Sequence, residues 1–137
     1  MAVVEELLRS EADGKVSFGN HRLAQKAKVE DYPHAGDLLK VKTCSAITKL
    51  EKNGMFLYES VPGTSVIDFT ERENGVEFIV EGDEDAQITV GLTDETEYEV
   101  FVDGKSVGNM TTGLGRKLSL SVELENAGEV PVRIERV

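Results

Sequence analysis

The feature that most constrains this chain is a regular alternation of apolar and polar side chains in its second half. Every second residue is apolar in segments 76–81, 86–90, 98–102, 118–124 and 130–135. A repeat of two residues is the period of a β-strand, whose successive side chains point to opposite faces of a sheet. The alternation therefore predicts a sheet with one face in a core and the other in water.

Turn signals separate further short segments of β type. Asn53-Gly54 and Asp103-Gly104 each predict a tight hairpin, because both turn positions accept a positive φ. Pro131 has no amide donor, which predicts an edge position for the last strand. Residues 32–36 are predicted to form a loop. In the first half we expect strands near 15–20, 22–29, 37–44, 47–51, 55–61 and 65–71.

The N-terminal segment has a different pattern. Val3, Val4, Leu7 and Leu8 recur at helical spacing, and Asp13-Gly14 follows as a stop signal. This predicts a short amphipathic helix at about residues 2–11. So short a helix is marginal alone, and we expect it to dock on the sheet of its own chain or on another subunit.

Together these segments predict an all-β fold, made of one or more antiparallel β-sandwiches with a short N-terminal helix. A parallel α/β sheet would need intervening helices, and the sequence offers none. Charge and pattern change near residues 72–75. We therefore expect either two subdomains, 1–72 and 73–137, or one continuous domain.

The chain is strongly acidic, with a net charge of -11 over 137 residues. Residues 1–70 hold 9 basic and 10 acidic residues, whereas residues 71–137 hold 6 and 16, so the acidity belongs to the second half. An acidic surface repels phosphate backbones and anionic lipid headgroups. We therefore expect no nucleic-acid partner and no membrane partner.

The single cysteine, Cys44, cannot form an internal disulfide, and one unpaired cysteine is typical of a reducing compartment. The first residues lack the basic start and long apolar core of a signal peptide, and no apolar run approaches the ~20 residues of a membrane span. We expect a cytoplasmic protein.

The residues predict no catalytic, cofactor or metal site. Cys44 with His21 or His34 is the one Cys/His pairing for nucleophilic catalysis, but Cys44 ends an apolar run where a buried thiol is expected. The spacing of these three residues matches no zinc pattern. The sequence favours a non-catalytic protein, but it does not decide whether the protein is an enzyme.

Two acidic clusters, 81–85 and 94–97, could supply oxygen ligands to calcium, although neither has the spacing of an EF-hand loop. Solvated turns are the alternative interpretation, and we favour it. Gly104-Lys105-Ser106 lacks the first glycine of a phosphate loop, since position 99 is Glu. A β-turn explains that motif better.

Segments 36–43, 47–56 and 58–64 resemble a family of short, largely uncharacterised clostridial proteins, and the resemblance continues through 81–92 and 117–124. Some members of this family are labelled endosialidase, which implies action on a sialylated glycan. The second half is also similar in architecture to immunoglobulin-like and fibronectin-like modules.

The family's label carries no catalytic residue onto this chain. Sialidases hold the sugar carboxylate with clustered arginines and display repeated boxes that contain tryptophan. Here the six arginines are scattered and tryptophan is absent. Tyr32, Tyr58 and Tyr98 remain as residues on which a sugar ring could stack.

The sequence thus predicts a non-catalytic protein that binds another protein or assembles with itself as a homo-oligomer, using sheet edges and the N-terminal helix. A glycan-binding or glycan-acting protein is the alternative, and a calcium-stabilised module is a third interpretation. The specific partner or ligand does not follow from the residues.

Overall fold

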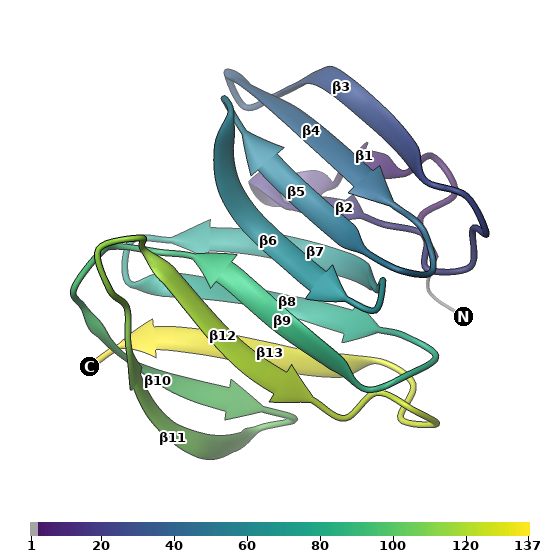
Figure 1. Ribbon diagram of the computed structural model, residues 1–137. Helices are drawn as coiled ribbons and strands as arrows, with labels where there is room; N and C mark the ends of the chain where they lie inside the picture. The colour runs from purple at the N-terminus through teal and green to yellow at the C-terminus, as the bar shows by residue number, and fades with distance from the viewer. Residues whose placement is uncertain (1–2) are drawn as a thin grey trace.

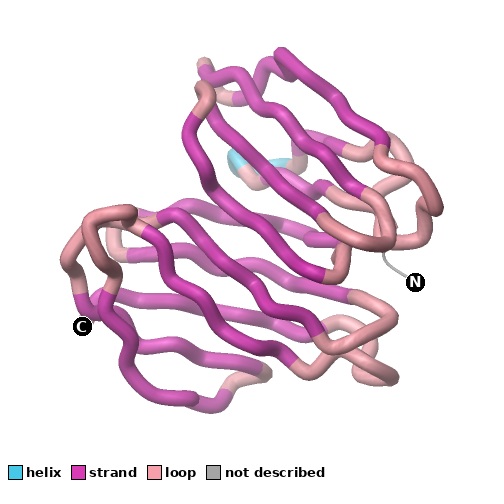
Figure 2. The backbone as a smooth tube through the Cα atoms, in the orientation of Figure 1, coloured by secondary structure: helices cyan, strands magenta, loops and turns pink. Residues whose placement is uncertain are grey.

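The computed structural model describes residues 3–137, and nearly all of this chain is strand and turn (Figures 1 and 2). All strand pairs are antiparallel. The thirteen strands of the described residues are β1 Leu8–Ser10, β2 Val16–Phe18, β3 Ala27–His34, β4 Asp37–Thr43, β5 Thr48–Lys52, β6 Met55–Val61, β7 Ser65–Arg72, β8 Gly75–Glu81, β9 Ala86–Gly91, β10 Glu97–Val102, β11 Lys105–Thr111, β12 Lys117–Val122 and β13 Val130–Arg136. The all-β prediction is confirmed.

The strands form two sheets. Sheet A has the order β1-β2-β7-β8-β13-β10-β11, and sheet B has the order β12-β9-β6-β5-β4-β3. Figure 1 shows them as two layers, with β9 and β12 passing in front of β8 and β13. Each sheet takes strands from both sides of residue 72, and that residue ends β7 in the β7–β8 hairpin.

One core joins the two sheets. Tyr58 of sheet B meets three rings of sheet A edge-on, with centroid distances of 5.2 Å to Phe18, 5.5 Å to Phe78 and 6.2 Å to Phe69. Edge-to-face contacts at such distances are favourable for aromatic pairs. The alternate apolar residues of β8, β9, β10, β12 and β13 complete this core, as their period predicts.

The predicted helix at residues 2–11 is wrong within the described residues. The chain is extended at β1, and the only helical segment in residues 3–137 is the short 3-10 turn η1, Ala12–Gly14, drawn cyan in Figure 2. Leu7 has a φ of 71°, which no α-helix contains, and Val4 N–H donates to Gly19 O at 3.0 Å. Val4 and Leu8 are buried, so the apolar residues reach the core through strand and turn instead. Residue 2 of the predicted helix lies outside the described residues.

The predicted edge position of the last strand is also wrong, because β13 lies between β8 and β10. Pro131 is the second residue of β13, and its carbonyl accepts a hydrogen bond from Asp103 N–H at 2.9 Å. In an antiparallel strand the nitrogen and carbonyl of one residue point to the same side. The nitrogen of Pro131 therefore faces the β10–β11 turn, beyond the last hydrogen bond between β13 and β10. The proline thus removes no donor that this sheet uses.

In the first half, β3 begins five residues later than expected and continues through the predicted loop to His34. The chain turns at Ala35-Gly36, where φ is 52° and 84°. The hairpins at Asn53-Gly54 and Asp103-Gly104 are confirmed, and both residues of each turn have positive φ.

Candidate functional site

The outer face of sheet A carries a row of apolar side chains. Ile67 of β7 is opposite Ile79 of β8, which is opposite Pro131 of β13. Phe101 of β10 lies next to this line, on the same face as Arg133. We call these four residues the apolar row: Ile67, Ile79, Phe101 and Pro131. An outer sheet face is expected to be polar, so four apolar neighbours on four strands are an exception to the alternation.

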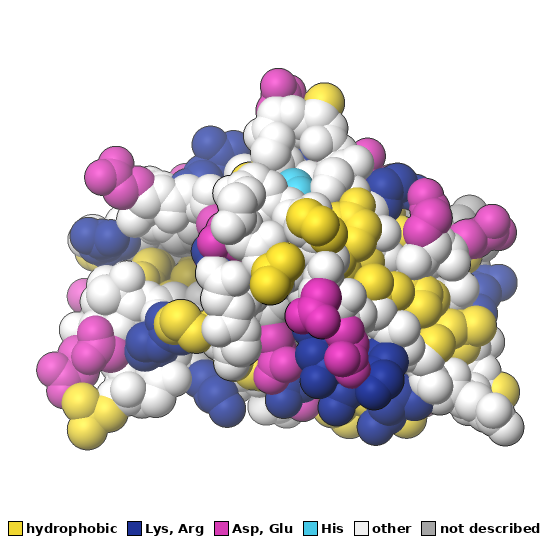
Figure 3. All heavy atoms as spheres, turned by 90° about the horizontal axis from the view of Figure 1, so that it is seen from above, with side chains coloured by type: hydrophobic (Ala, Val, Ile, Leu, Met, Phe, Trp, Pro, Cys, Tyr) yellow, Lys and Arg dark blue, Asp and Glu magenta, His cyan; other side chains and the backbone are white. Residues whose placement is uncertain are grey.

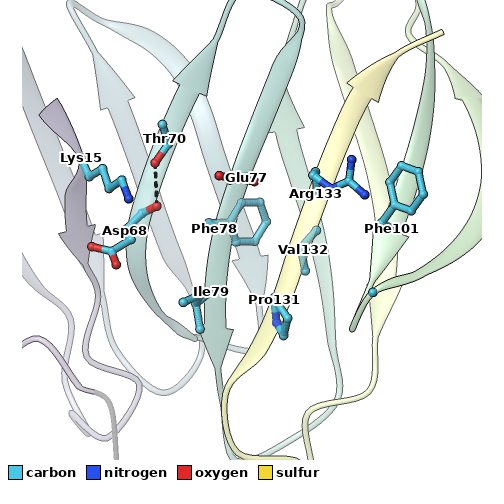
Figure 4. Close-up of a pocket in the computed structure, with 11 residues that line it drawn as sticks. Lys15, Asp68, Thr70, Glu77, Phe78, Ile79, Phe101, Pro131, Val132 and Arg133 are labelled. Atoms are coloured by element: carbon cyan, nitrogen blue, oxygen red, sulfur yellow. Dashed lines mark hydrogen bonds between the residues drawn. The ribbon is translucent and has the colours of Figure 1, made fainter. Parts of the chain in front are cut away.

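A hollow of about 320 Å³ lies over three residues of the apolar row: Ile79, Phe101 and Pro131. Figure 4 shows Lys15 and Asp68 on one side of it and Phe101 on the other, with Ile79 and Pro131 between them. We call this hollow the groove. Its volume lies at the lower end of the range for small-molecule pockets and also has room for one or two amino-acid side chains.

Arg133 covers the ring of Phe101. The guanidinium carbon lies 4.0 Å from the ring centroid, and Arg133 Nη1 donates to the carboxylate of Glu135. A guanidinium over an aromatic face is attracted to the negative face of the ring. Both side chains are therefore held in place on this side of the groove.

The opposite side of the groove is shaped by a bulge in β7. Strand register shifts between Ile67 and Thr70, and Asp68 has a φ of 56°. Asp68 N–H donates to Ser17 Oγ at 3.1 Å, and Thr70 Oγ1 donates to Asp68 O at 3.0 Å. Bulges often redirect a side chain beside a functional site. Here the bulge turns Asp68 toward the rim.

The support under this bulge is a buried serine. Ser17 is fully buried and donates to the Glu11 carboxylate at 2.6 Å, while Arg9 Nε donates to the same oxygen at 2.9 Å. These hydrogen bonds lower the pKa of Glu11, and the bond from Ser17 has the largest effect. The bulge therefore rests on an ionised carboxylate at neutral pH.

The charges at the groove are of both signs. Glu77 on the floor pairs with Arg72, and Arg133 with Glu135, while Lys15 and Asp68 stand at the rim. No His or Cys occurs among the described residues that line the groove. With apolar side chains on its floor and charged side chains at its rim, the arrangement can bind an amphipathic segment.

The structure does not bring together the Cys/His pairing that the sequence offered. Cys44 is buried and free. The ring of His21 instead lies 2.7 Å from Ser65 Oγ and 3.6 Å from Asp83, and that of His34 lies within 3.0 Å of Ser10 Oγ and Gly14 O. Ser65 is fully buried, so the Ser-His-Asp grouping has no access for a substrate.

The acidic clusters are partly occupied by protein contacts. Asp83 Oδ1 lies 3.3 Å from Arg22 Nη2, and Asp85 Oδ1 accepts from the N–H groups of Leu124 and Glu125. Within residues 3–137, no three side chains of His, Cys, Asp or Glu are grouped so as to hold a metal ion.

The tyrosines proposed for sugar stacking are mostly in the core. Tyr58 and Tyr98 are 0% and 2% exposed, so neither can offer a ring face to a sugar. Burial raises the pKa of the Tyr58 hydroxyl above its usual range, although hydrogen bonds to Thr64 and Ser60 oppose the rise. Tyr32 is half-buried, and its hydroxyl accepts from Ser10 N–H at 3.0 Å.

Basic side chains gather on part of the surface. Figure 3, seen from the top of Figure 1, shows lysine and arginine side chains gathered with acidic ones along one border, next to a band of hydrophobic atoms. Lys28, Lys42 and Lys49 lie opposite one another across β3, β4 and β5 on the outer face of sheet B. The groove on sheet A is a separate surface.

Sequence reasoning missed the apolar row, although a signal was present. Residues 78–80 and 100–102 are runs of three apolar residues within strands. In a strand the middle residue of such a run must point away from its neighbours, and in these two runs it is Ile79 and Phe101. Outward apolar residues in more than one strand segment are a sign of a binding face.

Comparisons of this chain with protein-family models, with curated proteins and with solved structures found no match. Among the described residues, no helix has the length and apolar character needed to cross a membrane.

Proposed function

We propose that this protein is a non-catalytic β-sandwich that binds another protein through the groove on the outer face of sheet A. The observation that carries the proposal is the apolar row, which places Ile67, Ile79, Phe101 and Pro131 on four strands of a face where water is expected. Apolar side chains grouped on a surface and bordered by charges are typical of protein contact sites.

The composition of the groove also fits a protein partner. Aromatic residues and arginine are the residue types most enriched where binding energy concentrates, and here Phe101 and Arg133 are stacked at 4.0 Å. The stacking fixes both side chains before a partner arrives, which lowers the entropy cost of binding. We infer a partner segment with one or two apolar side chains for the floor and polar groups for the rim.

A glycan ligand has less support. One face of the Phe101 ring is covered by Arg133, and Tyr58 and Tyr98 are buried, so these rings are not free to stack on a sugar. The resemblance to clostridial proteins and to immunoglobulin-like modules, and the cytoplasm as the working compartment, stay predictions. The buried free thiol of Cys44 is compatible with a reducing compartment.

The experiment that tests the proposal combines site-specific crosslinking with a binding measurement. A photoreactive residue replaces Pro131 in the groove or, as a control, exposed Val61 on sheet B, and crosslinked proteins are identified from cells that make the protein. We expect one partner at position 131 that is absent at position 61. The partner is then purified, and its affinity is measured by calorimetry.

Three matched variants complete the test. Ile79→Thr and Phe101→Thr make the apolar row polar and keep β propensity, while Val61→Thr makes the same kind of change on sheet B. We expect each groove variant to weaken binding tenfold or more and Val61→Thr to leave it unchanged. Equal affinity of all three variants, or crosslinks to a glycan alone, would overturn the proposal.

A further inference from the structure

Three of the four edge strands carry features that hinder pairing with another chain. β1 has only three residues. β3 contains Pro33 and a bulge at Asp31, and β11 has a bulge at Val107 followed by Gly108 with a φ of 111°. Short length, proline and bulges are the means by which soluble proteins protect sheet edges.

The fourth edge strand, β12, has none of these features. Its six residues pair with β9 from Lys117 to Val122 without any shift of register, and they include no glycine or proline. Leu118, Leu120 and Val122 are buried in the core, while Ser119 and Ser121 are exposed. Lys117, at the start of β12, is its one charged residue. A regular edge strand without proline, glycine or bulge is a template for the addition of another strand.

The backbone groups that β12 offers can be assigned from its ladder. Leu92 N–H donates to Arg116 O at 2.8 Å, so residues 116, 118, 120 and 122 direct their N–H and C=O groups toward β9. Lys117, Ser119 and Ser121 therefore direct theirs to the free side. Among the described residues no backbone hydrogen bond is made there.

The sequence of this edge is complementary to itself. Residues 117–123 read Lys-Leu-Ser-Leu-Ser-Val-Glu. Two copies placed antiparallel about Leu120 bring Lys117 opposite Glu123 at both ends. In the same register Ser119 lies opposite Ser121, Leu118 opposite Val122, and Leu120 opposite itself. Opposite charges directly across an antiparallel pair are stabilising.

The register also satisfies the backbone. Its central hydrogen-bonded pair is Ser119 with Ser121, and both are positions whose N–H and C=O groups face the free side, as are those of Lys117. Glu123 follows the last residue of β12, and in this register it continues the alternation as the partner of Lys117. A register shifted by one residue would place core side chains opposite outward ones. Charge, side-chain face and hydrogen-bond direction thus select the same alignment.

We propose that a second copy of this chain binds along β12, edge to edge and antiparallel about Leu120, to form a twofold-symmetric dimer. The two copies of sheet B then form one continuous sheet. This dimer goes beyond the proposed function, because the groove lies on sheet A and stays open in it. The net charge of -11 on each copy opposes association, so added salt tightens the dimer until the Lys–Glu pairs are also screened.

Sedimentation equilibrium of the full chain over a concentration series tests the proposal. We expect a monomer–dimer equilibrium. Ser119→Pro removes an N–H that faces the free side and leaves the ladder with β9 intact, so the fold persists while the dissociation constant rises about tenfold or more. Circular dichroism of the variant checks the fold.

Exchanging the charges of Lys117 and Glu123 tests the proposed register of the two β12 strands. Lys117→Glu and Glu123→Lys each place like charges opposite one another at both ends, and both are expected to weaken the dimer several-fold. The double variant restores opposite charges and the native net charge, and it should recover the native dissociation constant. Glu123→Lys is decisive because it reduces the net negative charge, so general repulsion alone would make that dimer tighter.

Four outcomes would overturn the proposal. These are a wild-type chain that stays monomeric at every concentration and salt level, a dimer that Ser119→Pro does not weaken, a dimer that Glu123→Lys tightens, and association into particles of no defined size.

Discussion

The imidazole Nδ1 of His21 lies 2.7 Å from the hydroxyl oxygen of Ser65, a residue 44 positions away in the sequence. His21 is 3% exposed and belongs to the loop after β2, whereas Ser65 begins β7. The contact therefore attaches this loop to the beginning of β7 in sheet A. Burial lowers the pKa of His21, and the nearby carboxylate of Asp83 only partly opposes that effect.

We expect the stability of this protein to depend on pH through His21. Its pKa in the native state is below the ordinary value of 6.5, so the unfolded state binds a proton first as the pH falls. The stabilising contribution is complete above pH 6.5 and is lost as the pH falls below that value toward the native pKa of His21. The free energy of unfolding should decline by up to about 1.4 kcal/mol per pH unit in that window.

The measurement is urea unfolding at a series of pH values between about 7.5 and 5. His21→Asn provides the control, because an amide nitrogen or oxygen near the position of Nδ1 can still bond to Ser65 but does not titrate. The fall in the free energy of unfolding with decreasing pH should be smaller in His21→Asn, and the difference from the native protein is the contribution of His21. Identical pH profiles of the two proteins would contradict the assignment.

A second prediction concerns the buried hydroxyl of Tyr58. This hydroxyl lies 2.7 Å from Thr64 Oγ1, which in turn lies 2.7 Å from Ser60 Oγ. Tyr58→Phe removes one partner from this buried network and should lower the free energy of unfolding by about 1–3 kcal/mol. Tyr32→Phe removes a hydroxyl whose hydrogen bonds are exposed, so the loss there should be clearly smaller. Chemical denaturation of both variants gives the comparison.

The strands of the second half could be predicted because the alternation of apolar and polar residues in the sequence matches the alternation of buried and exposed side chains in the sheet. A core on one face and water on the other imposes the alternation, and β9, β10 and β12 show it in their burial. The helix prediction for the N-terminal segment failed because the spacing of its apolar residues, 3, 4, 7 and 8, fits a helix and also fits a short strand with turns. There the pairing of β1 with β2 decided the structure, and local spacing does not contain that pairing.

The prediction that β13 is an edge strand failed for a related reason. A proline excludes a strand from a sheet interior only where its nitrogen faces a ladder partner, and that direction depends on register. The groove was beyond prediction because its walls come from strands that are not neighbours in sequence. Lys15 and Arg133 line the same hollow, and only the strand order of sheet A brings β2 and β13 to its two sides.

A third prediction follows from the close approach of two backbone segments. A Cβ at Gly63 would lie 1.9 Å from the carbonyl oxygen of Cys44, so any side chain there must displace the backbone. We expect Gly63→Ala to cost about 3 kcal/mol or to prevent folding. Gly113→Ala is the matched control, because no atom lies within 4 Å of its added Cβ. Thermal unfolding of the two variants should show a large loss for the first and little change for the second.

The last prediction uses the lysines on the outer face of sheet B. Lys42 lies directly between Lys28 of β3 and Lys49 of β5, and among the described residues it has no ion pair. Like charges directly opposite each other destabilise a sheet. Lys42→Glu replaces two repulsive pairs by two attractive ones, so it should raise the free energy of unfolding by about 0.5–1 kcal/mol at low salt.

The matched control lies two residues away on the same strand and face. Lys40 is opposite Glu51 and lies 4.0 Å from Glu30, so Lys40→Glu creates repulsion where attraction existed and should lower the free energy of unfolding. The two variants have the same net charge, and their difference therefore reports the local neighbours and not the overall acidity. Both effects should shrink in about 0.5 M salt, because the side chains are partly exposed and their charges are screened. Urea unfolding at two salt concentrations measures this, and shifts of the same sign in both variants would show that the cross-strand pairs do not govern the effect.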